Sequence, residues 1–323
     1  MNSFDSILII GFGGPTRIEE VRPFLANVTR GRNISDERIQ EVMHHYELIG
    51  GSSPYNELTL RQVHAFEEFA KKRGLNIPVY LGMRNWAPYL KETLAQMKKD
   101  GVRRAIGFIL APHRSYSSFD QYLENVEQAK RDSGFAELEV TYVDSWFDHP
   151  LFVEAVADRV RERGEGTFLI FTAHSIPKTM AQKCNYVWEI QTSSRFVAER
   201  VGVKHWTVAY QSRSGRPEDP WLEPDVNEVI HRLAMDGVRD LILVPIGFIS
   251  DHAEILYDLD HEAKKTVESL GIRFSRVTTV MDHPKFIEMM FDVIHNVIAS
   301  IAKQSPTQKN GVASSPQNGG SSQ

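Results

Sequence analysis

Eight short apolar runs alternate with longer amphipathic stretches along almost the whole chain, and this alternation limits the fold more than any other feature of the sequence. The runs are rich in β-branched and aromatic residues, which favour strands, whereas the stretches between them have the apolar spacing of helices. Near-continuous apolar strands separated by helices are typical of a parallel sheet covered on both faces. The expected strands span residues 6–12, 77–83, 105–112, 138–144, 167–174, 205–212, 241–248 and 272–280.

The chain also repeats itself. The tetrapeptide DGVR occurs at Asp100–Arg103 and again at Asp236–Arg239, each time just before an expected strand. The heptapeptides DHPLFVE and DHPKFIE begin at Asp148 and Asp282, and each places a proline in the first turn of an expected helix. Because both echoes occur in the same order and at nearly the same offset, we infer an internal duplication.

The duplication predicts an α/β fold of two similar, doubly wound halves with parallel sheets and a ligand cleft between their strand ends. At 323 residues the chain is long enough for two units that each have a core. We expect an N-terminal half at residues 1–148 and a C-terminal half at residues 149–303. Residues 304–323 lack aromatic and periodic apolar positions, so they should form a disordered tail.

Charge and cysteine content narrow the possible partners. A formal net charge of −5 gives no reason to expect a nucleic acid or an anionic membrane as partner. No apolar run approaches the length of a membrane span, and the N-terminus lacks the features of a secretory signal, so a cytoplasmic monomer is expected. The single cysteine, Cys184, excludes an internal disulfide and an iron–sulfur cluster held by four cysteines of one chain.

Residues 251–262, DHAEILYDLDHE, directly follow one of the expected strands. If this stretch is helical, Glu254, Asp258 and Glu262 are spaced i, i+4 and i+8 and stack as one acidic ridge. Carboxylates in a row repel one another, and ligands of open α/β sheets bind at strand ends. We therefore expect the ridge to meet a cation, although a solvated helix face would have the same composition.

Histidines end other expected strands. His174 ends the run LIFTAH, and APHRSYSS places His113 and Arg114 after another strand. A lone histidine in such a place would most simply cap the next segment, but its convergence with Glu254 favours a functional site. Imidazole and carboxylate groups suit Fe(II), Co(II) or Zn(II), and a site with few protein ligands releases its metal readily.

A glycine-rich turn, GFGGP at residues 11–15, follows the first expected strand. It lacks both the GxGxxG spacing and a following Lys-Ser or Lys-Thr, so no nucleotide is expected. The glycines instead suit the close approach of a flat ligand to the backbone. Arg30, Ser53, Arg84 and Trp86 occur near other turns of this half, which suggests a cleft for a large, flat molecule that bears carboxylates.

With these motifs in view, the chain resembles the ferrochelatases, enzymes that insert ferrous iron into a porphyrin at or near the end of haem synthesis. The resemblance runs from GFGGP to the helix near residue 300, and its motifs are NVTRGR, YELIGGSSP, APHRS, FTAHSIP, YQSR, DPWLEPD and PIGFISDHAEILYDLDHEA. It implies two Rossmann-like halves with the porphyrin between them, in agreement with the duplication. It also implies porphyrin and Fe(II) as substrates and haem as product.

For the metal site, the resemblance makes His174 and Glu254 a catalytic pair that faces each other across the porphyrin and binds the metal. Asp258 and Glu262 become further metal ligands, as the inner stations of an acidic path. His174 would accept a pyrrole proton, because a neutral imidazole is basic near pH 7. Which of His174 and Glu254 takes which proton stays open.

For the porphyrin, the resemblance places Phe12 on the face of the macrocycle and gives Arg30, Ser53 and Tyr122 the task of holding the ring and its propionates. Some Gram-positive members that prefer coproporphyrin have a tyrosine at the position of Phe12, so an axial phenolate is missing here. Glu223 also departs from the family pattern, which commonly has glycine there.

Several alternatives stay open at this point. The substrate could be protoporphyrin IX or coproporphyrin III. A cobalt or nickel chelatase of another tetrapyrrole would use the same ligand types, since these do not choose among first-row divalent metals. A non-catalytic haem or metal carrier would share the fold.

Overall fold

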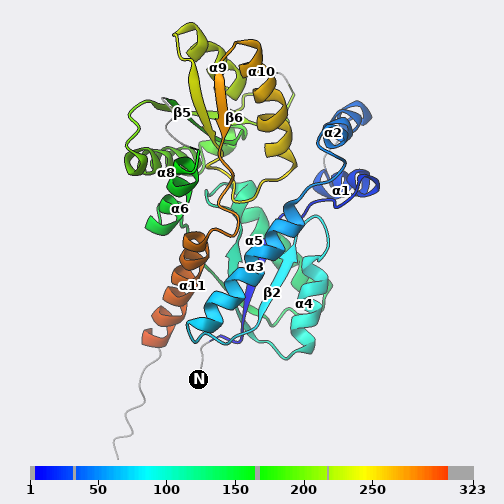
Figure 1. Cartoon of the computed structure of the whole chain (residues 1–323). Helices are drawn as coiled ribbons and strands as arrows, with labels where there is room; N and C mark the ends of the chain where they lie inside the picture. Colours follow the sequence, from blue (N-terminus) through cyan, green and yellow to red (C-terminus); the bar gives the residue numbers. More distant parts are fainter. Residues whose placement is uncertain (1–3, 32–33, 164–167, 217, 305–323) are drawn as a thin grey trace, which may run out of the picture.

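The computed structural model describes residues 4–31, 34–163, 168–216 and 218–304, which form two four-stranded sheets, one in each half of the chain (Figure 1). Every strand pairing is parallel. The strand orders are β2-β1-β3-β4 and β6-β5-β7-β8, so the second sheet repeats the order of the first. The predicted α/β fold with two similar parallel halves is therefore confirmed. Each strand of the described residues overlaps an expected run, and β3 and β7 begin one residue earlier than expected.

The first half combines its sheet with helices on both faces. Its strands are β1 (Ser6–Gly11), β2 (Val79–Met83), β3 (Arg104–Ile109) and β4 (Glu139–Tyr142). Its helices are η1 (Ile18–Glu20), α1 (Val21–Val28), α2 (Asp36–Leu48), α3 (Tyr55–Lys72), α4 (Leu90–Lys99), η2 (Tyr116–Asp120) and α5 (Gln121–Asp132). Along β1, Ile7 and Ile9 enter one apolar cluster whereas Leu8 and Ile10 enter another, as expected for a strand buried on both faces.

The second half follows the same plan. Its strands are β5 (Phe168–His174), β6 (Trp206–Gln211), β7 (Asp240–Val244) and β8 (Arg273–Arg276). Its helices are α6 (Pro150–Arg161), α7 (Lys178–Ala181), α8 (Tyr186–Val201), α9 (Val226–Met235), η3 (Ile255–Ala263), α10 (Lys264–Ser269) and α11 (Pro284–Gln304). Among the helices of the described ranges, none has both the length and the apolar character to cross a membrane.

Both sequence echoes have the same structural role in each half. Gly101 and Gly237 follow the helices α4 and α9 with positive φ angles of 77° and 86°, where a residue with a side chain would be strained. His149 and His283 precede α6 and α11, and the Nδ1 atom of each accepts a hydrogen bond of 3.3 Å from the backbone N–H two residues later. The duplication therefore extends to individual hydrogen bonds.

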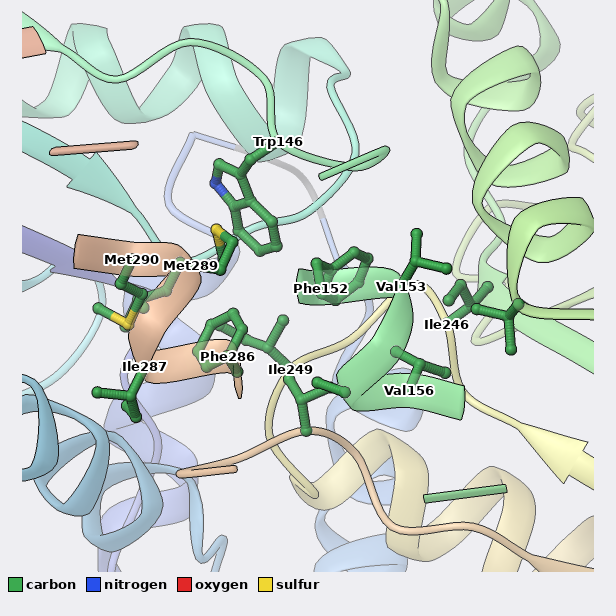
Figure 2. Close-up of a cluster of buried hydrophobic side chains, with 14 of the residues drawn as sticks. Trp146, Phe152, Val153, Val156, Ile246, Ile249, Phe286, Ile287, Met289 and Met290 are labelled. Carbon is green, nitrogen blue, oxygen red and sulfur yellow. The ribbon is translucent and has the colours of Figure 1, made fainter. Parts of the chain in front are cut away.

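One apolar core joins the two halves. Trp146, in the crossover between β4 and α6, stacks on Phe108 of β3 at 5.7 Å and contacts Phe152 of α6 at 5.1 Å and Phe286 of α11 at 5.8 Å, between ring centroids. Figure 2 shows Trp146, Phe152 and Phe286 gathered with other side chains of α6 and α11 and with Ile246 and Ile249, which follow β7. Helix α11 also packs against α3, so the last helix of the chain lies against the first half.

The predicted boundary near residue 148 falls in this crossover, and the division at residues 1–148 and 149–303 stays a prediction. Helix α11 ends at Gln304, the first residue of the predicted tail. The rest of that tail, residues 305–323, lies outside the described residues.

Helices α1 and α2 extend from the first half toward η3 of the second half (Figure 1). His45 of α2 stacks on Tyr257 of η3 with a ring separation of 3.6 Å and an interplanar angle of 10°. Ala253, just before η3, is buried in a cluster with Phe24 and Tyr46 of these helices. The two helices therefore pack directly against the segment that carries the acidic residues.

Removal of the Trp146 side chain should destabilise both halves together, since it fills the core that they share. We expect Trp146→Ala to lower the free energy of unfolding by about 3–5 kcal/mol. Urea denaturation followed by circular dichroism should show one transition, displaced to lower urea.

Trp188→Ala is the matched control, because the Trp188 side chain is 58% exposed. Its effect on the free energy of unfolding should stay within about 0.5 kcal/mol. Two separate transitions, of which Trp146→Ala displaces only one, would contradict a shared core.

Candidate active site

His174 is the last residue of β5, and parallel pairing places its ring at the carboxyl edge of the second sheet. The Nδ1 atom of the ring hydrogen-bonds the backbone carbonyl oxygen of Ser175. Because a carbonyl oxygen only accepts, Nδ1 carries the proton of the neutral ring, and Nε2 is left as a hydrogen-bond acceptor. The Tyr186 hydroxyl donates to the His174 carbonyl oxygen at 3.0 Å, which fixes the strand end behind the ring.

Glu254 lies opposite that ring. Its Oε1 atom is 3.8 Å from His174 Nε2, and the two side chains are 45% and 31% exposed. Glu254 precedes η3, where its backbone N–H donates to His252 Nδ1 at 3.2 Å. The predicted pair therefore comes together, with an acceptor nitrogen and a carboxylate in one place that solvent can reach.

The expectation that this pair faces each other across a porphyrin stays a prediction, and one distance in the described conformation bears on it. A flat ring between two side chains needs a non-bonded contact of about 3.5 Å on each face. The distance of 3.8 Å between His174 and Glu254 is too short for that. In the described conformation there is therefore no room for a flat ring between the two groups.

The acidic ridge lies on η3, which is a π-helix rather than the ordinary helix of the spacing argument. Positions four apart fall just short of one wide turn, so the acids still share a face. The pKa of Asp258 is raised to about 7, mainly by burial and in addition by the charges of Glu254 and Glu262, against the hydrogen bonds from Ser212 and Gln211. Burial also raises the pKa of Glu262, against a hydrogen bond of 3.2 Å from the Tyr257 hydroxyl.

Two residues at the end of β6 support Asp258. The Ser212 hydroxyl hydrogen-bonds Asp258 Oδ2, and Gln211 Nε2 donates to the same oxygen at 3.3 Å. Ser212 has a positive φ of 61°, an uncommon backbone conformation for a serine. Gln211 pairs in register with His174, so the sequence YQS at the end of this strand could have suggested the contact of Gln211 with Asp258. The backbone angle of Ser212 has no signal in the sequence.

The four porphyrin candidates lie in the first half. Phe12 is half-buried and meets Phe24 edge-on at 6.2 Å, and Tyr122 is buried. The Arg84 guanidinium lies over both rings, at 5.8 Å from Phe12 and 4.3 Å from Tyr122. Burial raises the pKa of Tyr122, Arg84 opposes this, and the charge of Glu254 adds to it, so Tyr122 lies within electrostatic reach of the second half.

The other two candidates make hydrogen bonds inside the first half. Ser53 is buried, donates its N–H to the Pro15 carbonyl oxygen at 2.8 Å and accepts the Tyr55 N–H at 3.3 Å. Arg30 is exposed near the end of α1 and donates to Asn27 Oδ1 at 2.7 Å. The structure therefore groups Phe12 with Tyr122 but leaves Arg30 on the surface.

The glycine-rich turn has an internal explanation. Gly13 has a positive φ of 87°, and a Cβ atom there would lie 2.9 Å from the Trp86 backbone nitrogen. A Cβ atom on Gly14 would lie 3.1 Å from the Ser53 side chain. The close approach that requires these glycines is thus to the chain itself.

His113 does not converge on the pair. It is buried, its Nε2 atom lies 3.0 Å from Ser193 Oγ, and burial lowers its pKa to about 3. It is a neutral core histidine. Glu223, whose effect could not be predicted, pairs with Lys178 at 2.8 Å on the surface, a contact that contributes little stability.

Within the described part of the chain, no three His, Cys, Asp or Glu side chains lie close enough together to enclose a metal ion. The His174–Glu254 pair by itself offers two protein ligands, and the role of Asp258 and Glu262 as further ligands stays a prediction. Such an open pair suits a metal that passes through as a substrate.

Comparisons with known proteins identify the family of the chain. The profile of the Ferrochelatase family matches residues 5–298. The chain is 40% identical over 308 residues to a ferrochelatase of Rhodopirellula baltica, covering 92% of this chain and 87% of that protein. It is also 40% identical over 307 residues to the coproporphyrin III ferrochelatase of Mycolicibacterium smegmatis, covering 92% and 90%.

Solved structures support the fold alone. SirB from Bacillus subtilis superposes with a TM-score of 0.59 at 14% identity, over 93% of this chain and 97% of that protein. The family profile and the two relatives extend over nearly the whole chain, including both strand ends that form the candidate site. The chain therefore belongs to the ferrochelatase family of porphyrin metal chelatases.

Proposed function

We propose that the His174–Glu254 pair carries out the insertion of Fe(II) into a porphyrin in haem biosynthesis. Two porphyrin N–H bonds break, bonds from nitrogen to iron form, and two protons leave. The observation that carries the proposal is the orientation of His174: its Nδ1 proton is held by Ser175, so Nε2 is free to accept a proton beside the Glu254 carboxylate. Membership of the ferrochelatase family supports this reaction.

In this mechanism His174 Nε2 accepts a pyrrole proton, and Glu254 ligates the incoming iron or takes the second proton. Both groups act from one side of the ring, since the distance of 3.8 Å between them leaves no room for a macrocycle. A cleft that bends the ring exposes the nitrogen lone pairs before the metal arrives, so binding energy lowers the barrier to metallation.

The acidic ridge is proposed as the route that joins this pair to solvent. Asp258, with a pKa near 7, changes charge in the neutral range, so it can pass protons outward or attract Fe(II) when ionised. Glu262 is exposed, so of these two inner stations it would be the one nearer to solvent.

The porphyrin is proposed to rest against Phe12 and Tyr122, with Arg30 and Ser53 near its propionates. Arg84, which lies over both aromatic rings, is a further candidate for a propionate partner. The proposal leaves protoporphyrin IX and coproporphyrin III both open as substrates. Phe12 has no oxygen to offer as an axial ligand, which weakly favours protoporphyrin IX.

No further cofactor enters the proposal. The single cysteine and the absence of a nucleotide fingerprint from the sequence support a reaction without an iron–sulfur cluster and without a nucleotide. We place the reaction in the cytoplasm and propose a monomer, a state that light scattering of the purified chain would check.

Substitution of His174 by alanine should abolish most metallation while leaving porphyrin binding nearly intact. We expect a fall of about 10²–10⁴-fold in turnover, the usual loss for a positioned base. Anaerobic absorbance assays with Fe(II) and each porphyrin measure turnover and identify the substrate, and fluorescence quenching measures porphyrin binding.

His64→Ala, on the exposed surface of α3, is the matched histidine control and should metallate normally. Near wild-type turnover in His174→Ala would contradict the role of His174 as proton acceptor. A wild-type chain that binds porphyrin but never turns over would instead indicate a carrier, and turnover with Co(II) or Ni(II) but not Fe(II) would indicate another chelatase.

Asp258→Asn should weaken iron use and stabilise the metal-free fold, because the raised pKa makes the charged form of Asp258 costly. The carboxyl binds a proton in the folded state up to about pH 7, whereas its ordinary pKa is 3.8. Stability of the wild type therefore falls as pH rises from about 4 to 7. The variant lacks this loss, so it should gain on the order of 1–4 kcal/mol above pH 7.

Thermal melts of metal-free wild type and variant between pH 4 and 8 measure this difference, which should grow with pH and then level off. Glu268→Gln, at an exposed position of α10, is the control and should show no such trend. A melting difference that is independent of pH would contradict the elevated pKa of Asp258.

A further inference from the structure

Arg276 connects Asp251 and Asp260, which lie on either side of Glu254 and Asp258 in the sequence. It lies at the end of β8, and its side chain is only 10% exposed. Its Nη1 atom donates to Asp251 Oδ2 at 2.7 Å, and its Nε atom donates to Asp260 Oδ1 at 2.8 Å. Asp251 precedes Glu254 by three residues, and Asp260 follows Asp258 by two.

We call the contacts of Arg276 with Asp251 and Asp260 the clamp. The two carboxylates of the clamp differ in how firmly they are held. Asp251 is buried, and its other oxygen accepts the Thr279 N–H at 3.0 Å, so it is anchored to the body of the second half. Asp260 lies on η3, and its side chain is 34% exposed. The guanidinium therefore ties the wide-turned helix to a fixed point.

The clamp acts on the side of η3 away from the supports of Asp258. Gln211 and Ser212, which hold Asp258, end β6, whereas Arg276 ends β8. These strands are the two opposite edges of the second sheet. The helix is thus pinned at both edges of the sheet, through Asp258 on one side and through Asp260 on the other.

These contacts on both sides of η3 counter two effects that destabilise the helix. Wide π-turns are rare and occur mostly as single turns, and a row of carboxylates on one face repels itself. A buried cation on the other side offsets part of this repulsion. Burial works against the charge of Arg276, but the hydrogen bonds to Asp260 and the charge of Asp251 outweigh burial and raise its pKa.

We propose that Arg276 is a positioning residue for metal delivery: by holding Asp251 and Asp260 it fixes Glu254 and Asp258 in the arrangement through which Fe(II) reaches the porphyrin. This inference rests on the proposed function. The side chain of Arg276 contacts Asp251 and Asp260, so its proposed effect passes through the acidic ridge. The guanidinium fork, which binds one carboxylate and reaches a second, is a geometry that lysine does not reproduce.

Kinetics of the full chain test the proposal. Arg276→Met should raise the KM for Fe(II) about 10-fold, the usual effect of removing a residue that orients a metal ligand. The KM for porphyrin should change less than about twofold, since the porphyrin candidates lie in the first half. Arg276→Lys should show roughly half of this rise in the KM for Fe(II) on a logarithmic scale, because lysine keeps the charge but lacks the planar guanidinium.

Arg273→Met is the matched control. Arg273 lies on the same strand and pairs with Asp240 at 2.9 Å, but its side chain is 81% exposed. Its kinetics should equal those of the wild type. Asp260→Asn tests the same proposal if Arg276→Met does not fold, because it weakens only the contact between Arg276 and η3. It should still raise the KM for Fe(II) about threefold.

A double-mutant cycle separates positioning from a general structural effect. In an Asp258→Asn/Glu262→Gln background, which itself should raise the KM for Fe(II), the further effect of Arg276→Met should shrink to less than about twofold. Equal rises in the KM values of both substrates, or a full effect of Arg276→Met in that background, would overturn the proposal. A wild type that inserts no iron would sink the proposed function and this inference together, whereas iron insertion with an unchanged Fe(II) KM in Arg276→Met and Asp260→Asn would sink only the inference.

Discussion

The parallel pairing of β5 with β6 and β7 is the constraint on which the candidate site depends. Because the three strands run in one direction, their carboxyl ends meet at one edge of the sheet. That edge carries His174 on β5, Gln211 on β6, and the loop after β7 that leads to Glu254. The distance of 3.8 Å between His174 and Glu254 is thus a product of sheet topology, since the two residues are 80 positions apart in sequence.

The carboxylates at this edge of the sheet repel one another, and neighbouring polar and cationic side chains offset part of that repulsion. Glu254 precedes η3 and Asp258 and Glu262 lie on it, and the elevated pKa of Asp258 reflects burial first and then the charges of the other two acids. Ser212 and Gln211 donate hydrogen bonds to Asp258, and Arg276 neutralises the opposite face of the helix through Asp260. A charged ridge that costs stability but attracts a divalent cation is the balance expected of a functional site.

Much of the fold could be predicted from the sequence because its signals are local. Continuous apolar runs such as residues 6–12 and 241–248 identify buried parallel strands, and the DGVR and DHP echoes identify the duplication. His174 and the acids from Glu254 onward could be singled out because each directly follows such a run. The spacing of those acids also predicted a shared face, which survives in the wider turns of η3.

The rest depends on contacts between distant parts of the chain. The choice of a π-helix, the clamp from Arg276 and the crossing of α11 to the first half leave no periodic trace in the sequence. His113 ends a strand just as His174 does, yet the side chains packed around it make it a core residue. The distance between His174 and Glu254 was likewise beyond sequence reasoning, because a resemblance assigns roles without fixing distances.

A crystal structure of the chain with porphyrin bound would test the central claim most directly. The account predicts His174 Nε2 and the Glu254 carboxylate on the same face of the macrocycle, both directed at its pyrrole nitrogens. A ring inserted between the two side chains, or bound away from the carboxyl edge of the second sheet, would contradict it.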